Sequence, residues 1–367
     1  MTNSNEELHL LLRSLKDLSP VKLEDTKKKI RTELISYRIT EPFPPWFANI
    51  EPSNNTPKNV VFYSFLDNPE KPAIANHEYK RLEISWRSLR KYNTDIEIRF
   101  CYSGSTTQSK NKWQALCEDY NVSMYPFHES FTGNEPNAWS IHRWYNLSLW
   151  ADEDLNILYL DADTYINDDV QILFDTYRRD AVYGREELGF RYDPNLGVSG
   201  KDPRFFLDLV DASMVSQGSR VDVHKYCLGV ILLNHSVHKI LSSKENLIFY
   251  TNLLKGVQDS SVFYPIPNYR IMDEFALWVL LGKNRLRTSL FGDQDVSHTF
   301  MEKKHEQHFN PVVLHYTTKD EEKFADWSPE FFCLSRTEEA REESDMSVDM
   351  TYNITSMIRE ELNIGLL

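Results

Sequence analysis

The segment Asn156-Ile157-Leu158-Tyr159-Leu160-Asp161-Ala162-Asp163-Thr164 joins a short apolar run to two acidic residues. The apolar residues 157–160 predict a buried β-strand. In a parallel sheet, ligands bind at the carboxyl ends of the strands. Side chains two residues apart on a strand point the same way, so Asp161 and Asp163 can both approach one divalent cation. We therefore predict a metal site here. The alternative is that the two acids only cap the following turn.

The Asp-x-Asp pattern is short and occurs at two further places, residues 152–154 and 293–295. Short motifs match by chance, so their surroundings have to distinguish them. Residues 152–154 and 293–295 lie in polar stretches, whereas Asp161 and Asp163 follow an apolar run directly. Only the latter pair is predicted to lie at a strand end.

Short apolar runs alternate with helical patterns from residue 58 onward. This alternation is typical of βαβ units. We therefore predict the α/β fold class, with a mostly parallel, Rossmann-like sheet flanked by helices. The predicted strands are residues 60–63, 96–100, 122–124, 157–160, 181–184, 227–233 and 312–315, and the predicted helices are residues 76–92, 110–120, 138–150, 203–213, 236–254 and 273–281.

Two helical patterns, residues 5–16 and 20–38, precede this region, and a proline-rich connector over residues 40–58 follows them. Near the other end, Asp320–Asp349 holds eleven acidic and three basic residues, which predicts a solvated surface segment. We therefore predict three parts. They are a helical extension with its connector over residues 1–57, the main domain over residues 58–327, and an acidic, partly helical tail over residues 328–367.

The composition excludes several classes of protein. Of 367 residues, 55 are Asp or Glu and 41 are Lys or Arg, so the net charge of −14 disfavours nucleic acid as a partner. No apolar run is long enough for a transmembrane helix, and the polar, acidic start differs from a secretion signal. The four cysteines are widely spaced, which fits a reducing compartment. We expect a cytoplasmic protein.

Four further residues are candidates for chemistry. His315 ends the predicted strand 312–315, and an imidazole beside two carboxylates makes a site that accepts Mn²⁺; a lone histidine there is more often structural. Arg143, on the predicted helix 138–150, has a planar guanidinium suited to a diphosphate, or it is a surface arginine covering nearby tryptophans. Asp273 and Glu274 open the predicted helix 273–281, where they either hold a sugar or cap the helix.

These residues together resemble the GT-A superfamily of nucleotide-sugar glycosyltransferases, and most closely the glycosyltransferase family 8 type that includes glycogenin and bacterial lipopolysaccharide galactosyltransferases. The similarity covers roughly residues 58–327. It rests on residues 158–164, the helix of Arg143, residues 227–234, Asp273 with Glu274, and residues 314–316.

The resemblance implies a site for a nucleoside diphosphate sugar. Asp161 and Asp163 would hold Mn²⁺ (or Mg²⁺) on the donor diphosphate, with His315 as the third protein ligand. Arg143 would contact the donor as well.

On the sugar side, the resemblance implies that Asn234 or the loop before Gly229 lies near the transferred sugar. We also place Tyr63, at the end of the first predicted strand, among the donor-binding residues. The chain departs from the family pattern at Cys227, where the family has asparagine. It also departs at 272–274, which match the family's Asp-Gln-Asp only loosely, and after His315, where the family expects Gly and then Lys-Pro-Trp.

The predicted reaction transfers a monosaccharide from a nucleoside diphosphate sugar, a UDP-hexose, to a hydroxyl of a glycan, lipid or protein acceptor. Asp273 or Glu274 would supply the base of an inverting reaction; the resemblance favours retention instead. One alternative is a non-catalytic nucleotide-sugar-binding protein. Another is an Asp-x-Asp phosphatase with Asp161 as nucleophile, but that motif needs Thr or Val four residues after the first Asp, and Thr164 is only three after it.

Overall fold

The computed structural model describes residues 2–15, 20–40, 56–67, 72–104, 106–129, 131, 138–178, 181–186, 203–258, 272–292, 294–298 and 311–315. The structural statements below concern these residues. Most of the predicted connector, residues 40–58, and the whole predicted tail, residues 328–367, lie outside them.

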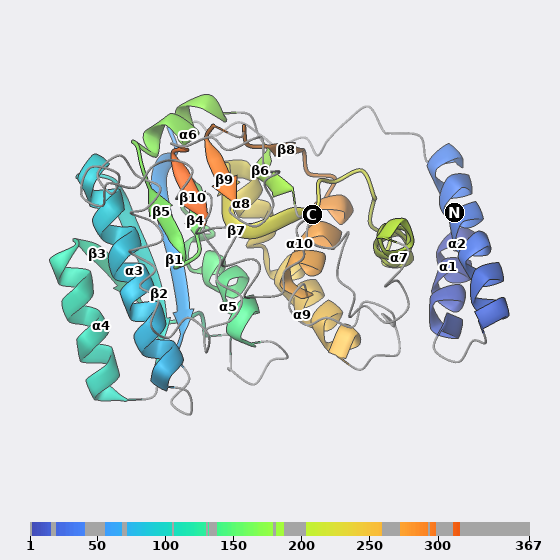
Figure 1. The fold of residues 1–367 in the computed structure, drawn as a ribbon, viewed down its shortest axis with the longest axis horizontal. Helices are drawn as coiled ribbons and strands as arrows, with labels where there is room; N and C mark the ends of the chain where they lie inside the picture. The colour runs from blue at the N-terminus through green and yellow to red at the C-terminus, as the bar shows by residue number, and fades with distance from the viewer. Residues whose placement is uncertain are drawn as a thin grey trace, which may run out of the picture.

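A seven-stranded sheet forms the centre of the fold, in the order β3-β2-β1-β4-β7-β6-β8 (Figure 1). Neighbouring strands are parallel except where β7 pairs with β4 and β6. The predicted mostly parallel sheet is therefore confirmed. Its strands are β1 (Lys58–Leu66), β2 (Glu97–Ser103), β3 (Val122–Tyr125), β4 (Leu155–Leu160), β6 (Val182–Glu186), β7 (Tyr226–Leu233) and β8 (Thr288–Leu290).

Helices cover both faces of this sheet because its central strands are apolar on both sides. Val60 and Phe62 of β1 enter one core and Val61 and Tyr63 enter the other, as the period of two requires. The first core is shared with α5 (Ala138–Leu147), α7 (Pro203–Ser216), α8 (His235–Leu241), α9 (Lys244–Gln258) and α10 (Met272–Lys283). The second is shared with α3 (Pro72–Tyr92), α4 (Thr107–Asp119) and α6 (Gln171–Thr176).

A second, three-stranded sheet lies beside the carboxyl end of β4. Its order is β5-β10-β9, with β5 (Thr164–Ile166), β9 (Val296–His298) and β10 (Val313–His315). β10 runs antiparallel to β5, and His315 pairs with Thr164. The chain thus passes from the large sheet to the small one within the turn that joins β4 to β5, which contains Asp161 and Asp163.

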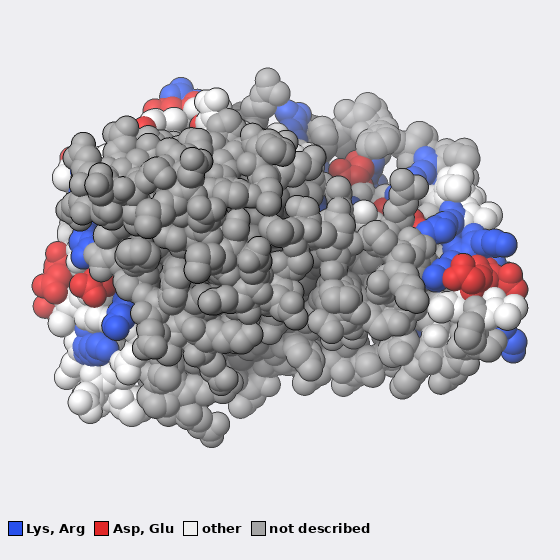
Figure 2. All heavy atoms as spheres, viewed as in Figure 1, with Lys and Arg blue, Asp and Glu red and all other residues white. Residues whose placement is uncertain are grey.

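The N-terminal helices α1 (Thr2–Ser14) and α2 (Pro20–Thr40) pack against α7, at the right of Figure 1. Their contact is a separate apolar core, and two ion pairs to α7 border it: Arg31 to Asp208 at 2.6 Å and Arg38 to Asp211 at 2.7 Å. Charged side chains of both signs lie over these helices in Figure 2. The core consists of Leu8, Leu12, Leu15, Ile30, Leu34, Leu209, Ala212 and Val215. The two helical predictions here are confirmed.

The structure differs from the predicted elements in a few places. The predicted helix 236–254 is two helices, because Ser242 donates to the His238 carbonyl and Ser243 accepts the Asn246 amide, which ends α8 and starts α9. The predicted helix 138–150 ends as the 3₁₀ turn Ser148–Trp150. The strands β5, β8 and β9 and the helix α6 were not predicted, since segments of three to six residues carry little periodicity. Among the described helices, none has the length and apolarity needed to cross a membrane.

Candidate active site

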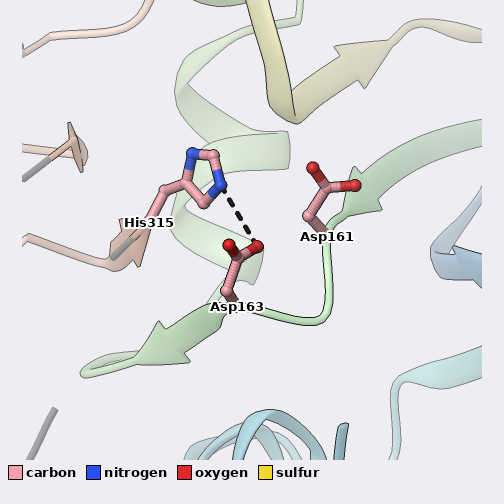
Figure 3. Close-up of side chains that lie close together, drawn as sticks. All are labelled: Asp161, Asp163 and His315. Carbon is pink, nitrogen blue, oxygen red and sulfur yellow. Dashed lines mark ion pairs between the residues drawn. The ribbon is translucent and has the colours of Figure 1, made fainter. Parts of the chain in front are cut away.

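Three metal-competent side chains meet where the two sheets join. Asp161 follows β4, Asp163 precedes β5 and His315 ends β10; one ligand atom of each lies within 4.8 Å of the others (Figure 3). The Nε2 atom of His315 is 3.3 Å from Oδ1 of Asp163. Asp163 and His315, which are 152 positions apart in the sequence, are brought together because β10 pairs with β5. The predicted trio is therefore a spatial cluster.

The electrostatics of this cluster suit a cation. Burial raises the pKa of Asp163, but the neighbouring His315 and, more weakly, Arg81 outweigh burial and hold it well below its usual range. Asp163 is therefore ionised, and it lies near a second carboxylate, Asp161. Two carboxylate oxygens and one imidazole nitrogen form a donor set that accepts Mn²⁺ or Mg²⁺. The residues present therefore fit the predicted metal ion.

Gly229 of β7 makes room for this arrangement. The Asp161 amide donates to the Gly229 carbonyl at 2.8 Å. β7 therefore lies directly beside residues 161–163, the turn between β4 and β5 that we call the acidic turn. A Cβ atom at Gly229 would lie 2.0 Å from Cε1 of His315, closer than side-chain carbons come to one another. Only glycine lets the imidazole lie against the strand in this position.

Cys227, at the place of the family's asparagine, contacts the other side of the same imidazole. Its Sγ is 3.9 Å from Nδ1 of His315, whereas Nε2 is directed toward Asp163. A ring nitrogen held by a neighbouring group fixes which nitrogen is left to bind a metal. Cys227 therefore contacts a predicted metal ligand, His315, and leaves its Nε2 directed toward Asp163.

Arg143 connects the cluster to α10. Its Nη1 donates to Oδ1 of Asp161 at 3.0 Å, and its Nη2 is 3.6 Å from Oδ2 of Asp273. Its guanidinium carbon lies 4.9 Å from the ring centre of Tyr159, whose hydroxyl donates to Asp161. Burial lowers the pKa of Arg143, but Asp161, Tyr159 and Asp273 together raise it above its usual value. Arg143 is thus a buried cation and not a surface arginine.

Asp273 and Glu274 occupy the first turn of α10, as predicted. Burial raises the pKa of Asp273 to about 6, although the Arg143 cation favours its ionised form. Glu274 is less buried, and its carboxylate accepts the Leu228 amide at 3.4 Å. The two neighbouring acids therefore lie in different environments: one holds Arg143 and the other contacts β7.

Two predicted donor-binding residues are not part of this cluster. Tyr63 is fully buried, with its hydroxyl 2.8 Å from Oγ of Ser85. Asn234 lies at the other end of the sheet: because β7 runs antiparallel to β4, its last residue, Leu233, pairs with Ile157. The amide of Asn234 donates to the Tyr177 carbonyl there. The start of β7, and not its end, reaches the acidic turn.

Tyr159 and Thr164 are two further residues at the site that were not predicted from the sequence. Tyr159 is two residues before Asp161, so the period of two already directed its side chain to the same side. For Thr164 the available signal was its place directly after the acidic pair. Its hydroxyl donates to the Asp161 carbonyl at 2.8 Å and closes the turn.

Comparison with known proteins bears on the class of this site. Residues 59–194, which include Arg143, Asp161 and Asp163, match the family described as glycosyl transferase family 8. No curated protein matches the chain.

Several solved structures are similar in fold. The galactosyltransferase LgtC, in complex with donor and acceptor sugar analogues, is 18% identical with a TM-score of 0.47, over 77% of this chain and 95% of that chain. Mouse xyloside xylosyltransferase 1 in its apo form is 9% identical with a TM-score of 0.45, over 71% and 98%. Core-mannan synthase A from Aspergillus fumigatus, in an Mn/GDP form, is 9% identical with a TM-score of 0.34, over 67% and 77%.

The sheet order, with β7 as the one reversed strand, and the acidic turn after β4 are those of the GT-A fold. Within that fold, residues 59–194 match the glycosyl transferase family 8 model. This match favours a glycosyltransferase over the Asp-x-Asp phosphatase.

Proposed function

We propose that this enzyme transfers a monosaccharide from a nucleoside diphosphate sugar, a UDP-hexose, to a hydroxyl group of its acceptor, and that a divalent ion, Mn²⁺ or Mg²⁺, is required. The observation that carries the proposal is the cluster of Asp161, Asp163 and His315 at the carboxyl end of β4. This is the edge of a parallel sheet where ligands bind.

The chemistry needs positive charge at the leaving group. Departure of a nucleoside diphosphate leaves negative charge on its phosphate oxygens, and a bound divalent cation supplies compensating charge there. Arg143 adds a second, permanent positive charge beside Asp161. Because Arg143 is buried and held by two carboxylates, its charge is already oriented before the donor arrives. Such preorganised charge stabilises a transition state more than a mobile side chain does.

The two acids of α10 serve this site in different ways. Asp273 holds Arg143 and keeps its guanidinium directed at Asp161. Glu274 has the more exposed carboxylate of the two and is the better candidate to contact the sugar or the acceptor hydroxyl. We propose retention of the anomeric configuration, as the resemblance to family 8 favours. Comparing the anomeric configuration of donor and product by nuclear magnetic resonance tests this directly.

A donor-hydrolysis assay tests the proposed function without knowledge of the acceptor. Purified full-length protein is incubated with a panel of UDP- and GDP-sugars and MnCl₂, and release of the nucleoside diphosphate is measured. We expect slow hydrolysis of one UDP-sugar, no hydrolysis with EDTA, and none by Asp163→Asn. Asp152→Asn is the matched control, because Asp152 belongs to another Asp-x-Asp pair and is exposed. Full activity in EDTA contradicts the metal requirement.

The compartment and the acceptor belong to the same proposal. The three cysteines in the described part of the chain, Cys101, Cys117 and Cys227, are buried and form no disulfide, which supports a reducing compartment, the cytoplasm. The acceptor is a glycan, a lipid or a protein with an accessible hydroxyl. Screening hydroxyl compounds of these three classes with the donor found above identifies which class is used.

A further inference from the structure

Three buried hydroxyl groups link the core of the large sheet to the acidic turn. The Tyr63 hydroxyl on β1 is 2.8 Å from Oγ of Ser85 on α3, which is 2.9 Å from Oγ1 of Thr164 on β5. Thr164 in turn donates to the Asp161 carbonyl at 2.8 Å. All three hydroxyl-bearing residues have no exposed surface. The chain of hydrogen bonds therefore ends on the backbone of a predicted metal ligand.

The direction of these hydrogen bonds is fixed by their last acceptor. A carbonyl oxygen only accepts, so the Thr164 hydroxyl donates its one hydrogen to the Asp161 carbonyl and must accept from the Ser85 hydroxyl. Ser85 then has to accept from Tyr63. Burial raises the pKa of Tyr63 well above its usual value, so the phenol keeps the proton it donates. Within this series of hydrogen bonds, Ser85 and Thr164 each donate and accept, and Tyr63 only donates.

Thr164 connects this chain to all three ligands. Its side chain holds the carbonyl of Asp161, its backbone directly follows Asp163, and its register partner across the small sheet is His315. The two sheets meet at this residue. A movement of Thr164 by a fraction of an ångström would therefore change the distances among all three ligand atoms.

We propose that Tyr63, Ser85 and Thr164 are positioning residues that set the metal affinity of the site. This inference rests on the proposed metal-dependent function. Tyr63 thereby acts on the site through two other residues and not by touching the donor. A purely structural role would predict something different: loss of a hydroxyl would lower the stability of the protein and leave its affinity for the metal unchanged.

The test measures Mn²⁺ binding to the full-length protein by calorimetric titration, without donor or acceptor. We expect Thr164→Val and Ser85→Ala each to weaken Mn²⁺ binding about tenfold, the range typical for residues that orient ligands. Tyr63→Phe should weaken it less, because Ser85 and Thr164 remain in place. Thr164→Ser keeps the hydroxyl and should bind Mn²⁺ as the wild type does.

The double variant gives a sharper result. Tyr63 and Ser85 both act on the acidic turn through Thr164, whose hydroxyl is the one that contacts the Asp161 carbonyl. Tyr63→Phe should therefore add nothing to the effect of Thr164→Val on Mn²⁺ affinity, whereas independent sites would give additive effects. If Thr164→Val does not fold, the pair Tyr63→Phe and Ser85→Ala tests the same coupling.

Ser219→Ala is the matched control. Ser219 is also fully buried, and its hydroxyl donates to the Val279 carbonyl at 2.8 Å, away from the acidic turn. The Ser219→Ala variant should be less stable than the wild type but bind Mn²⁺ with the same affinity. If Thr164→Val and Ser85→Ala bind Mn²⁺ as the wild type does, or if Ser219→Ala loses as much Mn²⁺ affinity as they do, the inference is wrong. The proposed metal requirement is not affected by either result. No Mn²⁺ binding by the wild type overturns the proposed metal requirement and the inference with it.

Discussion

The imidazole of His315 lies against the backbone of Gly229, where a Cβ atom would come within 2.0 Å of the ring. The two residues are on different sheets, β10 and β7. Their contact is therefore one of the places where the small sheet is fitted to the large one. Because His315 is the only nitrogen ligand of the predicted trio, the space left by Gly229 decides whether that ligand can reach the two carboxylates.

We predict that Gly229→Ala weakens Mn²⁺ binding tenfold or more. The new methyl group has to displace the ring, and overpacking of this kind also destabilises a protein by about 1–3 kcal/mol. Calorimetric titration with Mn²⁺ and urea unfolding separate the two effects. In the Gly229→Ala background, His315→Ala should cause no further loss of affinity. A further large loss would mean that the imidazole still binds the metal in the variant.

Arg143 is predicted to be required for turnover as a guanidinium and not only as a cation. Arg143→Lys keeps the charge but cannot reach Asp161 and Asp273 together. We expect the rate of donor hydrolysis at saturating donor to fall about a hundredfold, as for the loss of one preorganised charge contact. Arg143→Ala should in addition destabilise the fold, because it leaves the buried Asp273 unpaired. Arg38→Lys, an exchange in the pair to Asp211 on α7, should leave hydrolysis unchanged.

His238 is predicted to make stability depend on pH. It lies buried on α8, its Nε2 donates to the Leu147 carbonyl, and burial lowers its pKa to about 4. His238 takes up a proton near pH 6.5 in the unfolded chain but only near pH 4 in the folded protein. The free energy of unfolding is therefore highest above pH 6.5 and decreases as the pH falls from 6.5 to 4. The loss amounts to about 3 kcal/mol.

The measurement for His238 is the free energy of unfolding in urea between pH 7.5 and 4. His238→Gln keeps a donor for the Leu147 carbonyl and removes the titration, so its curve should be flatter over this range. Equal slopes for the variant and the wild type would contradict the assignment.

Arg90 is predicted to be a structural residue with no part in the reaction. Its guanidinium donates to five backbone carbonyls, those of Tyr120, Asn93, Thr94, Ile96 and Asn121. It thereby ties the end of α3 to the chain that enters β2 and β3. Arg90→Lys can replace only part of this set, and we expect a loss of about 2 kcal/mol in the free energy of unfolding. Mn²⁺ affinity should be unchanged. A drop in affinity would show that this end of the fold communicates with the metal site.

Much of the fold followed from local patterns. The apolar runs that predicted β1, β2, β4 and β7 are long enough to show that these strands are buried, and the N-terminal helices were visible as apolar faces. The small sheet was not visible as a sheet, because its strands have three residues each and pair only with one another. Asn234 was placed near the sugar by the family resemblance and Tyr63 was placed among the donor-binding residues; both follow or end a predicted strand. Those places do not reveal which face or which end of the sheet a side chain occupies.

The sequence by itself determined that an acidic pair follows a buried strand, and that a histidine ends another, because strand burial and the period of two are local properties. Only the tertiary structure decided that these residues meet. The pairing of β10 with β5 brings His315 opposite Thr164, and the reversed direction of β7 brings Gly229 and Cys227 to the site and takes Asn234 away from it. Strand direction and strand pairing depend on contacts between distant segments, and no local stretch of sequence encodes them.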